Sequence, residues 1–341
     1  MVTTDTSIIG VALSEMRELD FTREGLSWVF KACGVALGGT LLLGGQLSDL
    51  FAGSPGRGIP GRQKLAGTGT KCRMDAVSRS QARRSAVSDR DSVLGSAAWV
   101  QQTHGWMIAA ERRSLVGPLA RTHLTNAVGR LRMAVRMHPG RNACIPESRL
   151  AVPETALTRA ARKVAEDTLA PTLLHHSYRT YRFGRALGEL DGLLVDDELL
   201  FAAAILHDTG LMNPPNSSDF TLSSMRLARE VADQVGLSPA ATEVMQTAIT
   251  MHYTPGVTTA AGTEAYLVSA GAALDVAGVR SWDLPPQTLN NAVRDYPRAG
   301  FKKAFADAFR AEAIRVPQGR ARFVNRYGAL ITAIKLAPFD E

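Results

Sequence analysis

The feature that most constrains the fold is a series of helix start and stop signals from residue 145 to the C-terminus. Pro171 suits the first turn of a helix, where the backbone nitrogens have no acceptor within the helix. Asp196 or Asp197 can cap the next helix, and Gly210 stands just past its end. No alternation of apolar and polar residues competes with these signals. The sequence therefore predicts an all-α domain.

About seven helices are expected in this part of the chain. They cover residues 172–188, 196–208, 223–235, 239–252, 263–276, 298–314 and 322–336. The second of these is apolar on almost every side, so it is expected to be largely buried.

Basic residues are concentrated in the middle of the chain. The 341 residues include 39 Lys and Arg against 32 Asp and Glu, a net charge of +7. Residues 54–149 alone hold 17 basic and 5 acidic side chains, whereas the segments on either side are slightly acidic. The positive charge therefore belongs to one segment and not to the helical domain.

Residues 54–145 are interpreted as a largely disordered basic linker, because they are rich in Pro, Gly, Ser and Arg. Only 96–110 and 115–137 look helical, and neither has a clean amphipathic face. Trp99 and Trp106 are the only Phe, Tyr or Trp residues between 54 and 145, which argues against nucleic acid as a partner of this segment. Three histidines share no helical register and are expected at the surface: His104, His123 and His138.

An uncharged run of 17 residues at 32–48 has the minimum length of a membrane-spanning helix. Composition alone also allows a buried glycine-rich helix. A secretory signal is not expected, because the residues before the run are acidic and amphipathic. The three cysteines, Cys33, Cys72 and Cys144, have no metal-binding spacing and suggest a reducing, cytoplasmic location.

Residues 3–53 resemble the end of the first and all of the second transmembrane helix of a drug/proton antiporter of the major facilitator superfamily, on the segments TTDTSIIGVAL and LDFTREGLSWVFKACGVALGGTLLLGGQLSDLF. Such transporters need about a dozen spans, so this segment cannot transport anything alone. We expect a truncated transporter-like fragment with weak membrane association through residues 26–51. The predicted division of the chain is therefore 1–53, the linker 54–145 and a helical domain 146–341.

Four ionisable residues lie within or at the ends of the expected apolar helices: His176, His207, Asp208 and Asp275. Burial without a partner would be costly for each of them. A divalent cation such as zinc, iron or manganese would remove that cost, since imidazole and carboxylate are its usual ligands. His207 and Asp208 are adjacent, so both can reach one ion only at a helix end, which Gly210 provides.

The ordered set of His, His-Asp and Asp resembles the signature of the HD superfamily of metal-dependent hydrolases. Over residues 145–325 the sequence is similar to the cyanamide hydratase-like branch of this superfamily, notably in DDELLFAAAILHDTGL, ITMHYTPGV and AYLVSAGAALDVAGV. The resemblance implies an HD-type helical bundle in which His176, His207, Asp208 and Asp275 bind the metal. It also implies that His252 faces the same cavity, although a role as a helix-capping cation is an alternative.

Substrate contacts are less defined by the sequence. Arg179, Tyr181 and Lys302 are candidates, although exposed side chains explain them equally well; Arg179 and His252 are taken as the catalytic pair. The family pattern Phe-Glu-x-x-Gly-Ala is altered here, because Thr221 follows Phe220 and Ser224 and Met225 stand at the Gly-Ala positions. A bulkier Met near the pocket would change the substrate or abolish turnover.

The resemblance implies an enzyme that activates water for attack on a small molecule, as in hydration of a nitrile to an amide or urea. The alternatives are an HD phosphohydrolase acting on a phosphate ester or nucleotide, and an inactive HD domain in a fusion protein. Arg179 and Arg182 lie near the motifs without a lysine cluster, which favours a small uncharged substrate.

Overall fold

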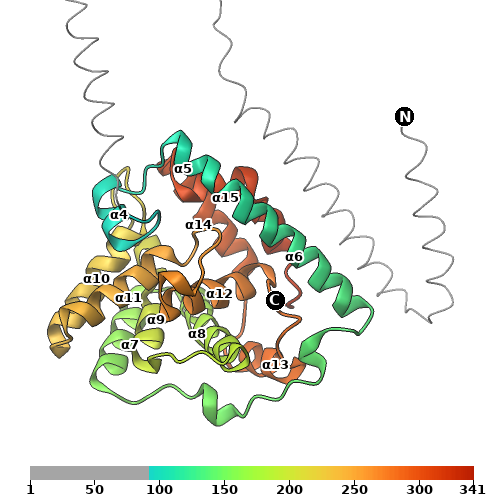
Figure 1. The fold of residues 1–341 in the computed structure, drawn as a ribbon. Helices are drawn as coiled ribbons and strands as arrows, with labels where there is room; N and C mark the ends of the chain where they lie inside the picture. Colours follow the sequence, from blue (N-terminus) through green and yellow to red (C-terminus); the bar gives the residue numbers. More distant parts are fainter. Residues whose placement is uncertain (1–91) are drawn as a thin grey trace, which may run out of the picture.

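The computed structural model describes residues 92–341. The predicted membrane helix within 1–53 and the first part of the predicted linker lie outside this range. Residues 92–341 form α-helices and short 3-10 turns without strands, which confirms the all-α prediction for this part of the chain (Figure 1). None of these helices combines the length and the apolar character that membrane crossing requires.

The helix labels follow Figure 1. The first three helices are α4 (Ala97–Thr103), α5 (Ala109–Ser114) and α6 (Val116–Ala134). The following helices are α7 (Ala156–Thr168), α8 (Pro171–Asp191), α9 (Asp197–Leu206), α10 (Thr221–Val235), α11 (Pro239–Met251), α12 (Thr263–Ala277), α13 (Pro286–Asp295), α14 (Phe301–Arg315), α15 (Arg320–Tyr327) and α16 (Leu330–Lys335).

The helix ends follow the capping signals of the sequence. Pro171 is the first residue of α8, and the carboxylate of Asp196 accepts hydrogen bonds from the backbone nitrogens at the start of α9. The hydroxyl of Ser238 caps α11 in the same way. α9 ends at Leu206, so the His-Asp pair directly follows a helix end, as expected.

Two parts of the helical pattern differ from the sequence prediction. The expected single helix 322–336 is broken into α15 and α16, because Ala329 adopts a left-handed conformation with φ of 46°. α7 and α13 were not predicted. α13 is short, and its apolar face consists only of Leu289, Ala292 and Val293, which is little from which to recognise a helix.

α8 and α12 cross at the centre of the bundle, and glycine makes their close approach feasible. A Cβ atom on Gly271 of α12 would lie 2.2 Å from the carbonyl oxygen of Thr180 on α8. α9 packs beside them, and every residue from Leu199 to Leu206 is buried. The helices that carry His176, Asp275 and the His-Asp pair therefore share one core.

The predicted disordered linker is wrong for the segment covered by α4, α5 and α6. Trp99 of α4 is fully buried, and its ring nitrogen donates to Glu111 Oε1 at 2.8 Å. It belongs to a cluster that unites these helices with α15: Trp99, Val100, Met107, Leu115, Leu119, Phe323 and Val324. The sequence hides this packing, because the apolar residues of the segment contact partners about 200 residues away and form no continuous stripe.

Candidate metal centre

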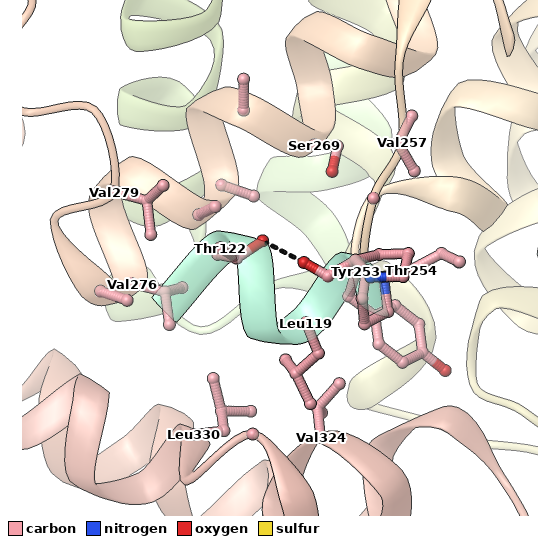
Figure 2. A pocket seen from close by; sticks show the side chains of 18 of the residues that line it. Leu119, Thr122, Tyr253, Thr254, Val257, Ser269, Val276, Val279, Val324 and Leu330 are labelled. Carbon is pink, nitrogen blue, oxygen red and sulfur yellow. Dashed lines mark hydrogen bonds between the residues drawn. The ribbon is translucent and has the colours of Figure 1, made fainter. Parts of the chain in front are cut away.

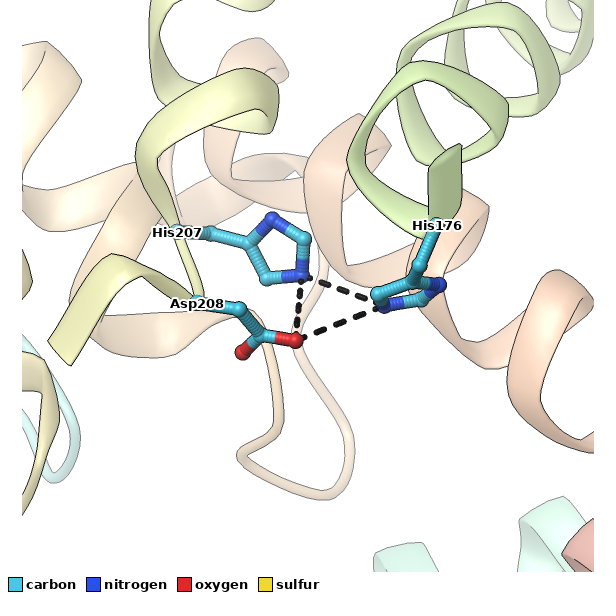
Figure 3. Close-up of side chains that lie close together, drawn as sticks. All are labelled: His176, His207 and Asp208. Carbon is cyan, nitrogen blue, oxygen red and sulfur yellow. Dashed lines mark hydrogen bonds and ion pairs between the residues drawn. The ribbon is translucent and has the colours of Figure 1, made fainter. Parts of the chain in front are cut away.

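Three side chains converge where α9 ends beside α8. His176 comes from α8, and His207 and Asp208 follow α9 (Figure 3). His207 Nε2 lies 3.2 Å from Asp208 Oδ2, and His176 Nε2 lies 3.5 Å from the same oxygen. The two Nε2 atoms are 3.3 Å apart. All three side chains are fully buried, and their ligand atoms are close enough to share one ion.

Each imidazole is oriented by a bond from its other nitrogen. His207 Nδ1 lies 2.7 Å from the Ala204 carbonyl oxygen, and His176 Nδ1 lies 2.7 Å from Asp275 Oδ2. His252 Nδ1 lies 2.6 Å from the Ile249 carbonyl oxygen. Because these partners are acceptors, Nδ1 carries the proton and Nε2 presents its lone pair. Metal-binding histidines are commonly fixed in this manner.

His252, at the end of α11, faces the same group, as the sequence resemblance implied. Its Nε2 lies 3.5 Å from Asp208 Oδ1, and its ring centroid is 4.6 Å from that of His207. Burial, reinforced by His207, lowers the pKa of His252 to about 3. At neutral pH this ring is therefore an uncharged proton acceptor. That state does not suit the alternative role of a helix-capping cation.

The carboxylate of Asp208 supports a cation in this position. Both oxygens are buried, and neither accepts a hydrogen bond from the residues of the 92–341 range. Burial by itself raises the pKa of this carboxyl, but His207, His252 and His176 outweigh burial and hold the pKa well below its usual range. A buried carboxylate without donors is costly, and a bound divalent cation satisfies it.

The electrostatics of the two other imidazoles differ. Burial lowers the pKa of His176. Burial acts in the same direction on His207, but the adjacent Asp208 carboxylate reverses it and raises the pKa of His207 above its usual value. Two imidazoles and a carboxylate form a donor set suited to zinc, iron or manganese, so the residues present fit a divalent metal.

Asp275 does not join this three-residue group. Its Oδ2 accepts from Nδ1 of His176, the ring nitrogen other than the one near Asp208. Arg179 donates to both carboxylate oxygens, at 2.8 and 2.9 Å, and Arg298 donates to Oδ1 at 2.5 Å. Direct metal ligation by Asp275 thus stays a prediction. In this arrangement the carboxylate orients the His176 ring.

The candidate substrate contacts lie elsewhere than expected. Arg179 is fully buried, its guanidinium is bound to Asp275 and to the Tyr296 carbonyl oxygen, and it does not line the cavity described below. Tyr181 is buried and donates to the Ala151 carbonyl oxygen. Lys302 donates to the Phe339 carbonyl oxygen. Within the described range, these interactions account for the three side chains without a substrate.

Sequence reasoning missed Arg298, which is also fully buried and contacts Asp275. The only feature of the sequence that singled out Arg298 was its position at the start of the expected helix 298–314. Its guanidinium also stacks on Phe301 and Phe339, with centroid distances of 4.7 and 5.0 Å. This contact depends on how the segment before α14 folds onto α12, which local patterns do not encode.

A cavity of about 780 Å³ extends from the histidines beneath α6 (Figure 2). His176, His252, Phe305 and Phe309 line its inner end. Its walls come from α12, α6, the last two helices and the segments that follow α11 and α12. Most of the side chains are apolar: Leu119, Val257, Val276, Val279, Val324 and Leu330. His123, expected at the surface, is half-buried and lines the cavity because α6 is ordered.

The altered segment after the His-Asp pair does not narrow this cavity. Thr221 is buried and donates to the Asp219 carboxylate, and Met225 is not a lining residue. The hydroxyl of Ser224 donates to the His207 carbonyl oxygen and accepts from Gly210 N, both at 2.8 Å. Ser224 therefore supports the turn that carries the two ligands.

Comparison with known families identifies the segment that contains this centre. Residues 173–289 match the HD domain family. The matched segment contains His176, His207, Asp208, His252 and Asp275, and HD domains are typically metal-dependent hydrolases. No curated protein matches the chain. The matched segment excludes α6 and α14 to α16, which supply much of the cavity wall.

Proposed function

We propose that the protein is a metal-dependent HD enzyme that adds water to an uncharged small molecule, with a nitrile carbon as the electrophile. The observation that carries this proposal is the buried Asp208 carboxylate, which accepts no hydrogen bond from residues 92–341 and lies among three imidazole Nε2 atoms. Two of these rings, His176 and His252, line the inner end of the cavity. His176, His207 and Asp208 would hold the ion. When bound, a divalent cation lowers the pKa of its water to about 7.

The remaining chemistry belongs to residues of the chain. His252 has its Nδ1 proton committed to Ile249, so its Nε2 can accept a proton from the attacking water and pass it to the nitrile nitrogen. The carbon gains the water oxygen, the nitrogen gains both hydrogens, and the product is an amide. Asp275, held by Arg179 and Arg298, keeps the His176 ring in place.

The cationic groups near the cavity favour an uncharged substrate over a phosphate ester. No lysine lines it within residues 92–341. Arg280 is bound to Asp191 and Asp283, at 2.7 Å in each case, and Arg121 is exposed. Phosphoryl transfer requires positioned cations that neutralise the phosphate oxygens, and a paired arginine does not supply them.

The test uses the purified full-length chain and its Asp208→Asn and His207→Ala variants. Metal content is measured by elemental analysis, and activity is assayed with cyanamide and with a generic phosphate monoester. We expect about one metal ion per chain and cyanamide hydration in the wild type, and loss of both in the variants. The control is His175→Ala, because His175 neighbours His176 on α8 but its ring bonds to the Pro297 carbonyl oxygen.

The outcomes separate the alternatives. A wild-type chain without bound metal contradicts the proposal and favours an inactive HD domain. Metal-dependent cleavage of the phosphate ester without cyanamide hydration would favour the phosphohydrolase alternative. Loss of activity in His175→Ala equal to that in His207→Ala would show that helix disruption, and not ligand removal, explains the variants.

A further inference from the structure

The cavity is far larger than cyanamide. Cyanamide has one carbon and two nitrogens, so it occupies roughly twice the ~30 Å³ that one water molecule takes up in the liquid. That is on the order of a tenth of the 780 Å³ cavity. Cavities of this size typically enclose most of the surface of a ligand as large as a drug molecule.

The lining of the cavity selects against charge. It contains no aspartate or glutamate within residues 92–341, and its arginines are the paired Arg280 and the exposed Arg121. Burial lowers the pKa of His123, so this ring is uncharged at neutral pH. Along these walls a charged group of the ligand would lose its hydration without gaining a charged side chain as partner, whereas an apolar body would gain from burial.

α6 closes the cavity as a fixed wall. At one end, Leu119 packs in the cluster that includes Val324. At the other end, Arg130 donates to the carbonyl oxygens of Ala277 and Leu336, at 2.8 and 3.1 Å. Gly129 lies so close to Trp282 that a Cβ atom would come within 2.1 Å of the indole. The cavity beneath α6 is therefore bounded on a side that lies outside the matched HD segment.

Ser269 is a polar group on the wall that remains available to a ligand. The hydroxyl of Thr122 already donates to the Pro118 carbonyl oxygen, at 3.1 Å. The side chain of Ser269 on α12 faces the cavity and makes no hydrogen bond within the described part of the chain (Figure 2). It can donate to or accept from a ligand that extends past it.

We infer that the cavity binds an uncharged organic molecule with a sizeable apolar body, whose reactive group lies at the His176 and His252 end and whose apolar part lies under α6. The nature of the reactive group rests on the proposed nitrile hydration. The apolar body rests only on the volume and lining of the cavity. Larger aliphatic or aromatic nitriles are therefore better substrates than cyanamide.

The first experiment measures binding without turnover. Acetamide, butanamide, hexanamide and benzamide, which are hydration products of the corresponding nitriles, are titrated into the full-length protein by calorimetry. We expect affinity to rise about fourfold for each methylene added from acetamide to hexanamide, because each is removed from water. Equal and weak binding of acetamide and hexanamide would overturn the inference.

Variants test where the apolar body lies. Ala273 and Ala270 line the cavity and are half-buried, so Ala273→Leu and Ala270→Leu fill space beside the ligand. Each is expected to weaken hexanamide binding at least tenfold and to leave acetamide binding nearly unchanged. Ala311→Leu, at an exposed position of α14, is the matched control. Thermal denaturation shows whether each variant folds. If one cavity variant does not fold, hexanamide binding by the other tests the inference.

Turnover distinguishes this inference from the proposed function. Acetonitrile, hexanenitrile, benzonitrile and cyanamide are compared by kcat/KM. Size-dependent amide binding without hydration of any nitrile supports the apolar site and contradicts the proposed reaction. Hydration in which cyanamide exceeds all larger nitriles supports the proposed reaction and overturns the inference. Unchanged hexanamide binding in both folded cavity variants overturns it as well.

Discussion

Replacement of Asp275 by asparagine tests how the centre is held together. The carboxylate accepts hydrogen bonds from His176 and from two fully buried arginines, Arg179 and Arg298. Asparagine has the same shape but no charge, and its NH₂ group must face donors that now lack an acceptor. The two buried guanidinium groups then have lost the carboxylate that both of them contact in the wild type. Removal of one partner of a buried ion pair costs about 3 to 5 kcal/mol.

The assay is thermal and urea denaturation of the wild type and Asp275→Asn. For a folded unit of this size we expect the Tm to fall by about 6 to 20 °C, from roughly 2 to 4 °C per kcal/mol. Asp307→Asn is the control, since Asp307 is half-exposed and pairs with Lys303 and Arg310 on the surface of α14. Such exposed pairs contribute little to stability, because solvent screens them.

Metal affinity supplies a second measurement on the same variant. If Asp275 orients His176, Asp275→Asn should weaken metal binding by about 10- to 100-fold, as removal of a partner behind a ligand does. Asp208→Asn should abolish binding. A stability change no larger than that of Asp307→Asn would refute the reasoning about the buried pair. Loss of metal as complete as in Asp208→Asn would instead make Asp275 a direct ligand.

Three further predictions concern the frame around the centre. Burial, reinforced by Asp219, raises the pKa of Glu312 to about 7, above that of an unfolded glutamate, so its stabilising contribution falls as pH rises towards 7. In the wild type this effect lowers the unfolding free energy by at most about 1.4 kcal/mol per pH unit between roughly pH 4.5 and 7. Glu312→Gln removes the titrating group, so the unfolding free energy should fall less steeply with pH. An unchanged slope would contradict this. Gly271→Ala should cost about 1 to 3 kcal/mol in urea denaturation by forcing α8 and α12 apart, whereas Gly117→Ala, with open space around it, should not destabilise. Trp99→Ala should cost about 3 to 5 kcal/mol by the same measurement, since its ring is fully buried; no change would mean that α4 does not belong to the folded unit.

The sequence predicted the local features of the fold well. Pro171 and Asp196 act on neighbouring backbone groups, so the starts of α8 and α9 could be predicted from the sequence. The helix end expected before Gly210 likewise placed His207 and Asp208 at the end of α9, although α9 stops at Leu206 and Gly210 lies in the 3-10 turn that follows. These signals act over a few residues and do not depend on the remainder of the chain.

Only the tertiary structure placed the groups that act across the fold. Arg298 reaches Asp275 because the segment before α14 folds onto α12. Asp275, expected as a metal ligand, instead contacts Nδ1 of His176, the ring nitrogen that faces away from Asp208. α6 became a cavity wall because its apolar residues and Arg130 find partners far along the chain, Leu336 being 206 residues away.

The sequence by itself therefore predicted most of the helices after residue 170 and four candidate metal ligands, three of which the structure brings together. It could not determine the size, lining or boundary of the space that a substrate would occupy. Helix signals arise from the energetics of adjacent residues, whereas a cavity is the volume left when distant helices pack, and its shape depends on all of those contacts together.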